Sequence, residues 1–403
     1  MRNNKKSGMT LVSTALLATI IIVSVVGGGL VGYFVNNWVI SGRINELQSQ
    51  LSTLQENMTN TQAQNVTNQN NTYFLEDNVS LSRLYDEVKN SVVVIRGMAL
   101  VSNGLMYYYA QVQGSGFVYN CTGNIVIVTN YHVVQNSVNI TVTFINGNGY
   151  AATLLGSDRY ADLAVLSIGA PQSNLKPLEI VSSSALEVGD PVIAVGNPYG
   201  LAGSMTAGIV SALGRTITEA MTGSYSIPDI IQTSTPINSG NSGGPLLTYQ
   251  GKVVGITTAI ISNSQGLGFA IPSSTILREI GSLIAKGSYN QHPSMDAAGI
   301  DMTYEIAKAM NTNTTYGWLV VQVTADGPAD KAGLKAGSQQ TVVAGDYVII
   351  GGDIVIAING ARITNTDDLL TYLEENVLPN QIIDLTIVRN NQTLVLPLTV
   401  GAL

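Results

Sequence analysis

The chain has 403 residues, which is long enough for two or three domains of ordinary size. Only 11% of its residues are charged, 45% are hydrophobic, and the formal net charge is −8. An acidic chain with so few cationic side chains argues against nucleic acid as a partner. The one cysteine, Cys121, excludes an intrachain disulfide, and we assign it no role.

The N-terminal 39 residues have the pattern of a membrane anchor. Residues 1–8 contain three basic side chains, and the strongly apolar residues 9–39 exceed the roughly 20 residues needed to span a bilayer. The excess of basic residues before this run predicts a cytoplasmic N-terminus. A cleaved signal peptide is the alternative, but the run is too long for one and lacks an Ala-x-Ala site near its end. We therefore expect a single-pass membrane protein whose remaining residues are extracytoplasmic.

Residues 40–80 are expected to form a stalk or linker. Apolar residues from Ile44 to Met58 are spaced alternately by three and four, which predicts a coiled-coil seam of two heptads. Two heptads are short, so a weak amphipathic helix is an equal alternative. Residues 59–72 are rich in Asn, Gln and Thr and are expected to be a flexible spacer.

From residue 81 to about 290, short apolar runs alternate with Gly, Asn and Pro, which predicts an antiparallel β-barrel protein. Within this region, residues 239–246 read SGNSGGPL and precede an apolar strand. A nucleophilic serine needs an exposed tight turn and backbone N–H groups that converge on the oxyanion, and glycines permit both. Ser242 is therefore the candidate nucleophile.

A serine nucleophile also needs a base and a carboxylate that orients it. Of the two histidines, His132 follows an apolar strand, whereas His292 lies in a polar segment before proline that reads as a linker. Asp162 begins an apolar strand, where an aspartate is unexpected unless it caps or pairs with another group. Asp158 and Asp190 are alternatives, although their neighbours predict turns.

The order His132, Asp162, Ser242 is that of chymotrypsin-type triads. Four segments resemble the signature blocks of the HtrA (DegP/DegS-like) serine proteases, in family order and at family spacing. These segments are residues 129–133 (TNYHV), 162–166 (DLAVL), 240–246 (GNSGGPL) and 268–272 (GFAIP).

The resemblance implies a mostly β fold, with a chymotrypsin-like double β-barrel over residues 81–290. His132 and Asp162 would come from the first barrel and Ser242 from the second, and the backbone N–H groups of Gly240 and Ser242 would form the oxyanion hole. Ile237 would line a primary specificity pocket for small aliphatic side chains. The resemblance also implies a homotrimer, and neither a cofactor nor a metal is expected.

Residues 297–403 are expected to form one PDZ domain of α+β type, because residues 327–337 resemble the turn-and-helix block of bacterial PDZ domains. Exposed amides at Gly317, Trp318 and Leu319 would bind the carboxylate of a hydrophobic C-terminal peptide, which would add to the sheet as a strand. The ring of Trp318 is expected either in the pocket wall or in the core.

The predicted function is that of a membrane-anchored serine endopeptidase that cleaves misfolded or unfolded polypeptides and is regulated by peptides bound to the PDZ domain. Two features depart from the family: residues 234–239 (STPINS) differ before the nucleophile, and residues 338–351 form an insertion. The alternative is a latent or inactive protease-fold chaperone or peptide-binding scaffold. A serine esterase is disfavoured, because its histidine would follow its serine.

Overall fold

The computed structural model describes residues 80–102, 106–197, 203–219, 225–238, 240–258 and 267–403. These residues all belong to one compact unit, Asn78–Leu403. The expected membrane span and nearly all of the expected stalk lie outside the described residues. Among the helices that the structure does describe, none has the length and apolarity to cross a bilayer.

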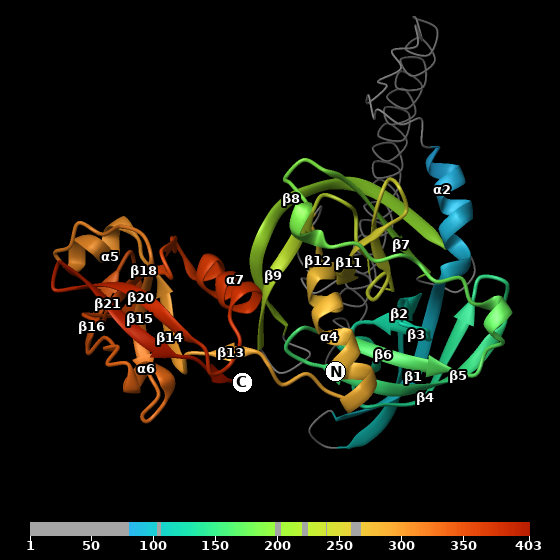
Figure 1. The fold of residues 1–403 in the computed structure, drawn as a ribbon, viewed down its shortest axis with the longest axis horizontal. Coiled ribbons are helices and arrows are strands. Elements are labelled where there is room, and N and C mark those ends of the chain that lie inside the picture. The colour runs from blue at the N-terminus through green and yellow to red at the C-terminus, as the bar shows by residue number, and fades with distance from the viewer. Residues whose placement is uncertain (1–79, 103–105, 198–202, 220–224, 239, 259–266) are drawn as a thin grey trace, which may run out of the picture. The chain divides into compact units, whose positions relative to one another are not determined.

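The first barrel begins after a short helix, α2 (Leu81–Val88), and a 3₁₀ turn, Lys89–Ser91. Its six strands close in the order β1-β2-β3-β6-β5-β4 (Figure 1). The elements of this barrel are β1 (Val92–Ser102), β2 (Tyr107–Cys121), β3 (Asn124–Thr129), α3 (Tyr131–Val134), β4 (Ser137–Phe144), β5 (Gly149–Asp158) and β6 (Leu163–Ile168).

The second barrel follows two more 3₁₀ turns, Gln172–Asn174 and Ser183–Ala185, and closes in the order β10-β11-β12-β9-β8-β7. Helix α4 (Ser273–Lys286) continues directly from its last strand and ends at Gly287, whose φ of 81° forms a left-handed cap. The strands are β7 (Pro191–Gly196), β8 (Ser204–Glu219), β9 (Tyr225–Thr233), β10 (Pro245–Thr248), β11 (Val253–Thr258) and β12 (Gly268–Pro272).

Strands β3 and β7 are buried on both faces. Because successive side chains of a strand point to opposite faces, neighbouring residues of one strand lie in different apolar clusters. In β3, Ile127 points into the core of the first barrel, whereas Val126 and Val128 belong to a cluster that both barrels share. In β7, Ile193 joins the shared cluster and Ala194 the core of the second barrel. The nearly continuous apolar runs in the sequence therefore correspond to two barrel interiors and one apolar interface between them.

The C-terminal domain is a sheet with the strand order β14-β15-β18-β20-β21, to which β19 adds beside β18. One face packs against α7 and α6, and the other face packs against α5 and the β16–β17 hairpin. Strand β14 is at the edge of the sheet. The elements are β13 (Pro293–Ser294), β14 (Ala297–Asp301), α5 (Tyr304–Ala309), β15 (Trp318–Val323), α6 (Pro328–Lys331), β16 (Gln339–Val343), β17 (Asp346–Ile350), β18 (Ile354–Ile358), β19 (Ala361–Arg362), α7 (Thr366–Asn376), β20 (Ile382–Arg389), β21 (Gln392–Thr399) and β22 (Gly401–Ala402).

The predicted fold class is confirmed for its globular part, which is a double six-stranded barrel followed by a PDZ-like β domain. The insertion at residues 338–351 forms the β16–β17 hairpin, in which five residue pairs are in register. This hairpin packs on one face of the sheet and α7 packs on the other, so the insertion does not cover the face against which α7 packs.

Candidate active site

His132 and Asp162 lie together because β3 and β6 pair side by side. Thr129 in β3 is opposite Ala164 in β6, so the residues just after β3 meet the residues just before β6. His132 lies in the one-turn helix α3, and its Nδ1 is 2.8 Å from Oδ2 of Asp162. This contact holds the imidazole with Nδ1 toward the carboxylate.

Asp162 is fully buried and accepts hydrogen bonds at both carboxylate oxygens. The backbone N–H of His132 donates to Oδ1 at 2.9 Å, while Thr258 Oγ1 lies 3.5 Å from Oδ2. Its φ of 50° is in the left-handed region, which Asp and Asn tolerate better than most residues. The backbone carbonyl of Asp162 also accepts from the N–H of Tyr131 at 3.0 Å and the side-chain amide of Asn130 at 3.0 Å. These contacts fix the position of the carboxylate.

The two alternative aspartates have other partners. Asp158 is 2.5 Å from Nε2 of His292, and Asp190 accepts from the backbone N–H of Glu187 at 2.9 Å. Of the three candidates, Asp162 is therefore the one that contacts and orients His132.

Ser242 lies in a loop whose turns depend on glycine, with φ of 94° at Gly240 and 86° at Gly243. Its backbone carbonyl accepts from the N–H of Ser115 at 2.8 Å. A Cβ added to Gly114 would lie 2.6 Å from Val133 and 3.1 Å from the carbonyl oxygen of Ser242. The helix that carries His132 and the loop that carries Ser242 therefore meet at Gly114, at the boundary of the two barrels.

Ile237 lies on the approach to this loop and packs half-buried against the core of the second barrel. A Cβ added to Gly268 in β12 would lie only 2.7 Å from Cγ1 of Ile237. The absence of a side chain at Gly268 thus leaves room for Ile237 beside the nucleophile loop.

The sequence predictions missed three buried hydroxyls at this site. Ser115 donates to the carbonyl of Gly240, Thr257 donates to that of Asn241, and Thr258 approaches Asp162. A hydroxyl on an otherwise apolar buried strand is a usable signal, because a buried polar group needs a partner. Thr257 and Thr258 end the apolar strand β11 in this way.

The predicted carboxylate-binding amides at Gly317, Trp318 and Leu319 are placed inside the sheet. The N–H of Gly317 donates to the carbonyl of Thr364 at 2.8 Å, while Trp318 and Leu319 begin β15, which pairs with β14 on one side and β18 on the other. This geometry disfavours the predicted role, because a peptide strand must add at an unpaired edge. The edge strands of this sheet are β14 and β21, and β14 is the one next to β15, which contains Trp318.

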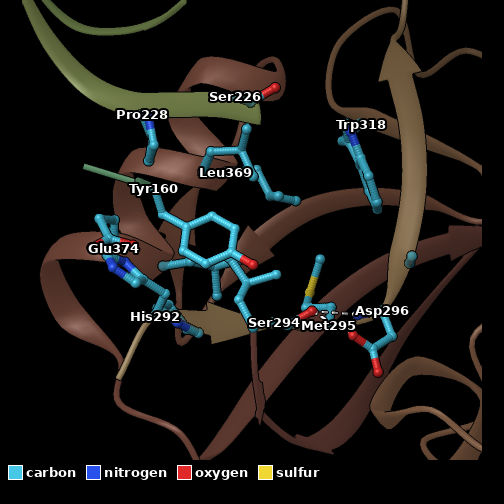
Figure 2. A pocket seen from close by; sticks show the side chains of 15 residues that line it. Tyr160, Ser226, Pro228, His292, Ser294, Met295, Asp296, Trp318, Leu369 and Glu374 are labelled. Carbon is cyan, nitrogen blue, oxygen red and sulfur yellow. Dashed lines mark hydrogen bonds and ion pairs between the residues drawn. The ribbon is translucent and has the colours of Figure 1, made fainter. Parts of the chain in front are cut away.

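A cavity of about 300 Å³ lies beside that edge (Figure 2). Trp318 is 4% exposed, so its ring is part of the core and at the same time lines this cavity. The lining residues come from β14 and the segment before it, from α7 and from the protease barrels, and include Met295, Ala297, Leu369, Leu373, Tyr160 and Pro228.

His292, expected in a polar linker, is instead buried in a charged cluster between these elements. Its Nε2 is 2.5 Å from Asp158, and its Nδ1 is 3.0 Å from Glu374 in α7. Burial alone would lower the pKa of His292, but the hydrogen bonds to the two carboxylates outweigh it and raise the pKa to about 10. The ring is therefore an imidazolium that joins the protease domain to the PDZ domain.

Two further carboxyl groups, those of Glu279 and Asp229, have strongly raised pKa values. Burial, reinforced by the charge of Asp158, raises the pKa of Glu279 to about 8. Burial, reinforced by Glu375, likewise raises the pKa of Asp229 to about 8. Both groups are therefore largely protonated at neutral pH.

Asp158, Glu279 and His292 are also the set of side chains, within the described residues, whose ligand atoms lie close enough to hold a metal ion. Both ring nitrogens of His292 are already hydrogen-bonded to carboxylates. An imidazolium has no lone pair for a metal, so the arrangement is that of an ion-pair network.

Comparison with known proteins assigns a domain family to each of the two globular regions of the chain. Residues 114–256 match the model of the trypsin-like peptidase domain, and residues 299–400 match that of the PDZ domain. Over 305 residues the chain is 37% identical to Protease Do-like 1, chloroplastic, of Arabidopsis thaliana, covering 74% of this chain and 66% of that protein. The chain belongs to the HtrA family of trypsin-like serine proteases.

Other members of the HtrA family support this assignment. A probable periplasmic serine endoprotease of Brucella suis, described as DegP-like, is 38% identical over 297 residues, which are 72% of this chain and 53% of that protein. The chain thus spans between about half and two thirds of these relatives' lengths. A solved structure of the HtrA-type protease AlgW with a decapeptide superposes with a TM-score of 0.61 at 28% identity, covering 81% of this chain and 99% of that one.

Proposed function

We propose that this HtrA family member is a serine endopeptidase that hydrolyses peptide bonds with the triad Ser242, His132 and Asp162. The observation that carries the proposal is the 2.8 Å contact between His132 Nδ1 and the buried Asp162 carboxylate, next to the glycine-rich loop of Ser242. Asp162 holds the tautomer in which Nε2 is unprotonated and stabilises the imidazolium. Nε2 then accepts the proton of Ser242 during attack and returns it to the leaving amine.

The backbone N–H groups of Gly240 and Ser242 are proposed to bind the oxyanion. Each such donor contributes roughly 10²–10³ in rate. Ile237 is proposed to border the primary specificity pocket, where its bulk favours small aliphatic side chains.

Hydrophobic C-terminal peptides are proposed to regulate the enzyme by adding as a strand to β14, with their side chains toward α7. Three features support this position: β14 is an edge strand of the sheet, the adjacent cavity is largely apolar, and a solved structure of AlgW holds a decapeptide. Tyr160 and Pro228 of the protease domain also line this cavity, so a bound peptide would touch both domains.

The substrates are proposed to be misfolded or unfolded polypeptides outside the cytoplasm, as the periplasmic name of the Brucella relative suggests. Anchoring through residues 9–39 and assembly as a homotrimer remain proposals based on the sequence and its resemblance.

The test is casein cleavage by the full chain and by Ser242→Ala, with and without hydrophobic C-terminal peptides. We expect cleavage by the wild type, none by the variant, and stimulation by peptides. If the wild type and the variant are equally inert with every peptide, the proposed activity is refuted and the latent chaperone or scaffold replaces it.

A further inference from the structure

We infer that Ser115, in the first barrel, is a positioning residue for the oxyanion hole in the second barrel. This inference rests on the proposed function. Ser115 is fully buried, and its Oγ lies 2.7 Å from the carbonyl oxygen of Gly240 and 2.9 Å from the backbone nitrogen of Asn197. One hydroxyl in β2 thus links two segments of the other barrel.

The direction of both hydrogen bonds is fixed by chemistry. The N–H of Asn197 can only donate, so Ser115 Oγ accepts from it. The carbonyl of Gly240 can only accept, so the Ser115 hydroxyl donates its single proton to it. The backbone of Ser115 is also held, because its N–H donates to Ser242 at 2.8 Å and its carbonyl accepts from Thr129 at 2.7 Å.

The contact with Gly240 matters because the proposed oxyanion donors are backbone groups, whose directions follow from the peptide planes around them. Anchoring the Gly240 carbonyl fixes the plane that it shares with Asn241, whose N–H donates to Asn238 at 3.0 Å. The next carbonyl, that of Asn241, accepts from Thr257 Oγ1 at 2.7 Å, which directs the N–H of Ser242 the opposite way. The loop is therefore held at two successive carbonyls.

Gly240 is the point at which this loop can most easily rotate, because glycine adopts many backbone conformations at little cost. Its φ of 94° lies in the region that other residues avoid. Without the Ser115 hydroxyl, the carbonyl of Gly240 and the N–H of Asn197 both lose a buried partner. Rotation about the Gly240 backbone would relieve this, and because the 240–241 peptide plane joins the planes that carry the N–H groups of Gly240 and Ser242, it would change the orientation of these two donors relative to each other.

The test compares Ser115→Ala with Ser273→Ala in the full chain, using a peptide substrate and a peptide boronic acid, whose adduct places an oxygen in the oxyanion hole. Ser273 is the matched control, since it is also fully buried and donates to a backbone carbonyl, that of Val181, at 2.5 Å. We expect Ser115→Ala to lower kcat by about ten- to a hundredfold with KM nearly unchanged, and to weaken boronate binding by a similar factor. Ser273→Ala should lose a similar amount of thermal stability and keep its kcat.

Equal kcat in the two variants would overturn the inference and leave Ser115 as an ordinary buried hydroxyl. If the wild type itself is as inert as Ser242→Ala, the proposed function fails, and the crystal structure of Ser115→Ala decides the positioning role separately. A rotated Gly240 carbonyl supports that role, and an unmoved one refutes it.

Discussion

The triad makes a quantitative prediction at Asp162, where an amide cannot satisfy both of its neighbours. The carboxylate now accepts from the backbone N–H of His132 at 2.9 Å and faces Nδ1 at 2.8 Å. In Asp162→Asn one oxygen becomes an NH₂ group, which must face one of these two nitrogens. Asparagine has the same shape and also tolerates the φ of 50° found here, so the variant should fold.

Energetics decide which nitrogen the NH₂ group faces. Facing the His132 N–H would leave a buried backbone donor unpaired, which costs about 1–3 kcal/mol. Facing Nδ1 requires only that the proton move to Nε2, which then cannot accept the proton of Ser242. We therefore expect kcat to fall about 10⁴-fold, or about 5.4 kcal/mol, the size known for this change in a Ser-His-Asp triad.

The assay is the initial rate of peptide cleavage, accompanied by thermal unfolding to confirm the fold. Asp346→Asn, at an exposed position of the β16–β17 hairpin, is the matched control and should keep full activity. A folded Asp162→Asn enzyme within about tenfold of the wild-type kcat would refute the orienting role.

Three further predictions concern packing and charge. Gly243→Ala would place a Cβ 2.1 Å from the carbonyl oxygen of Ser115 at a φ of 86°, so we expect a loss of about 2–4 kcal/mol and of most activity, measured by denaturation and cleavage. His292→Ala leaves the buried Asp158 carboxylate without its cation, while Glu374 keeps its ion pair with Arg278, and should lower the free energy of unfolding by about 3–5 kcal/mol, whereas Gln291→Ala, at an exposed position, should not. The pKa values are raised to about 8 for Asp229 and Glu279 and to about 10 for His292. The folded state therefore retains protons that the unfolded state releases. As a result, the free energy of unfolding should fall as the pH rises from about 5 to about 10. Urea denaturation across this range tests the sign, Glu279→Gln should flatten the part below pH 8, and a stability that rises with pH would contradict the assignment.

The two barrels and the contact between His132 and Asp162 could be predicted from the sequence, because the strands depend on local pattern. Apolar runs such as 125–128 and 163–166 define strands by themselves, and the residues at their ends are positioned by strand pairing. The family blocks add the order in which those ends meet. Nothing in this reasoning requires knowledge of distant contacts.

Two predictions failed where the outcome depends on distant residues. His292 looks like part of a linker, but its partners lie 134 and 82 residues away along the chain. The segment around Gly317 has the glycine and apolar residues of a peptide-binding loop, yet the strand order places it between two neighbours. The strand order of the whole sheet decides which strands lie at its edges, and the residue pattern of a single segment does not reveal that order.

The buried imidazolium of His292 has a consequence for how far the two domains are modular. A boundary drawn near residue 290 separates them neatly in the sequence, but it passes through the network of Asp158, Glu279, His292 and Glu374. A protease domain truncated there would keep the buried carboxyl groups of Asp158 and Glu279, together with Arg278, which pairs with Glu279, and would lose the His292 cation and the Glu374 carboxylate. The two domains therefore share buried ion pairs. As a result, the free energies of unfolding of the separate domains should not add up to that of the whole chain.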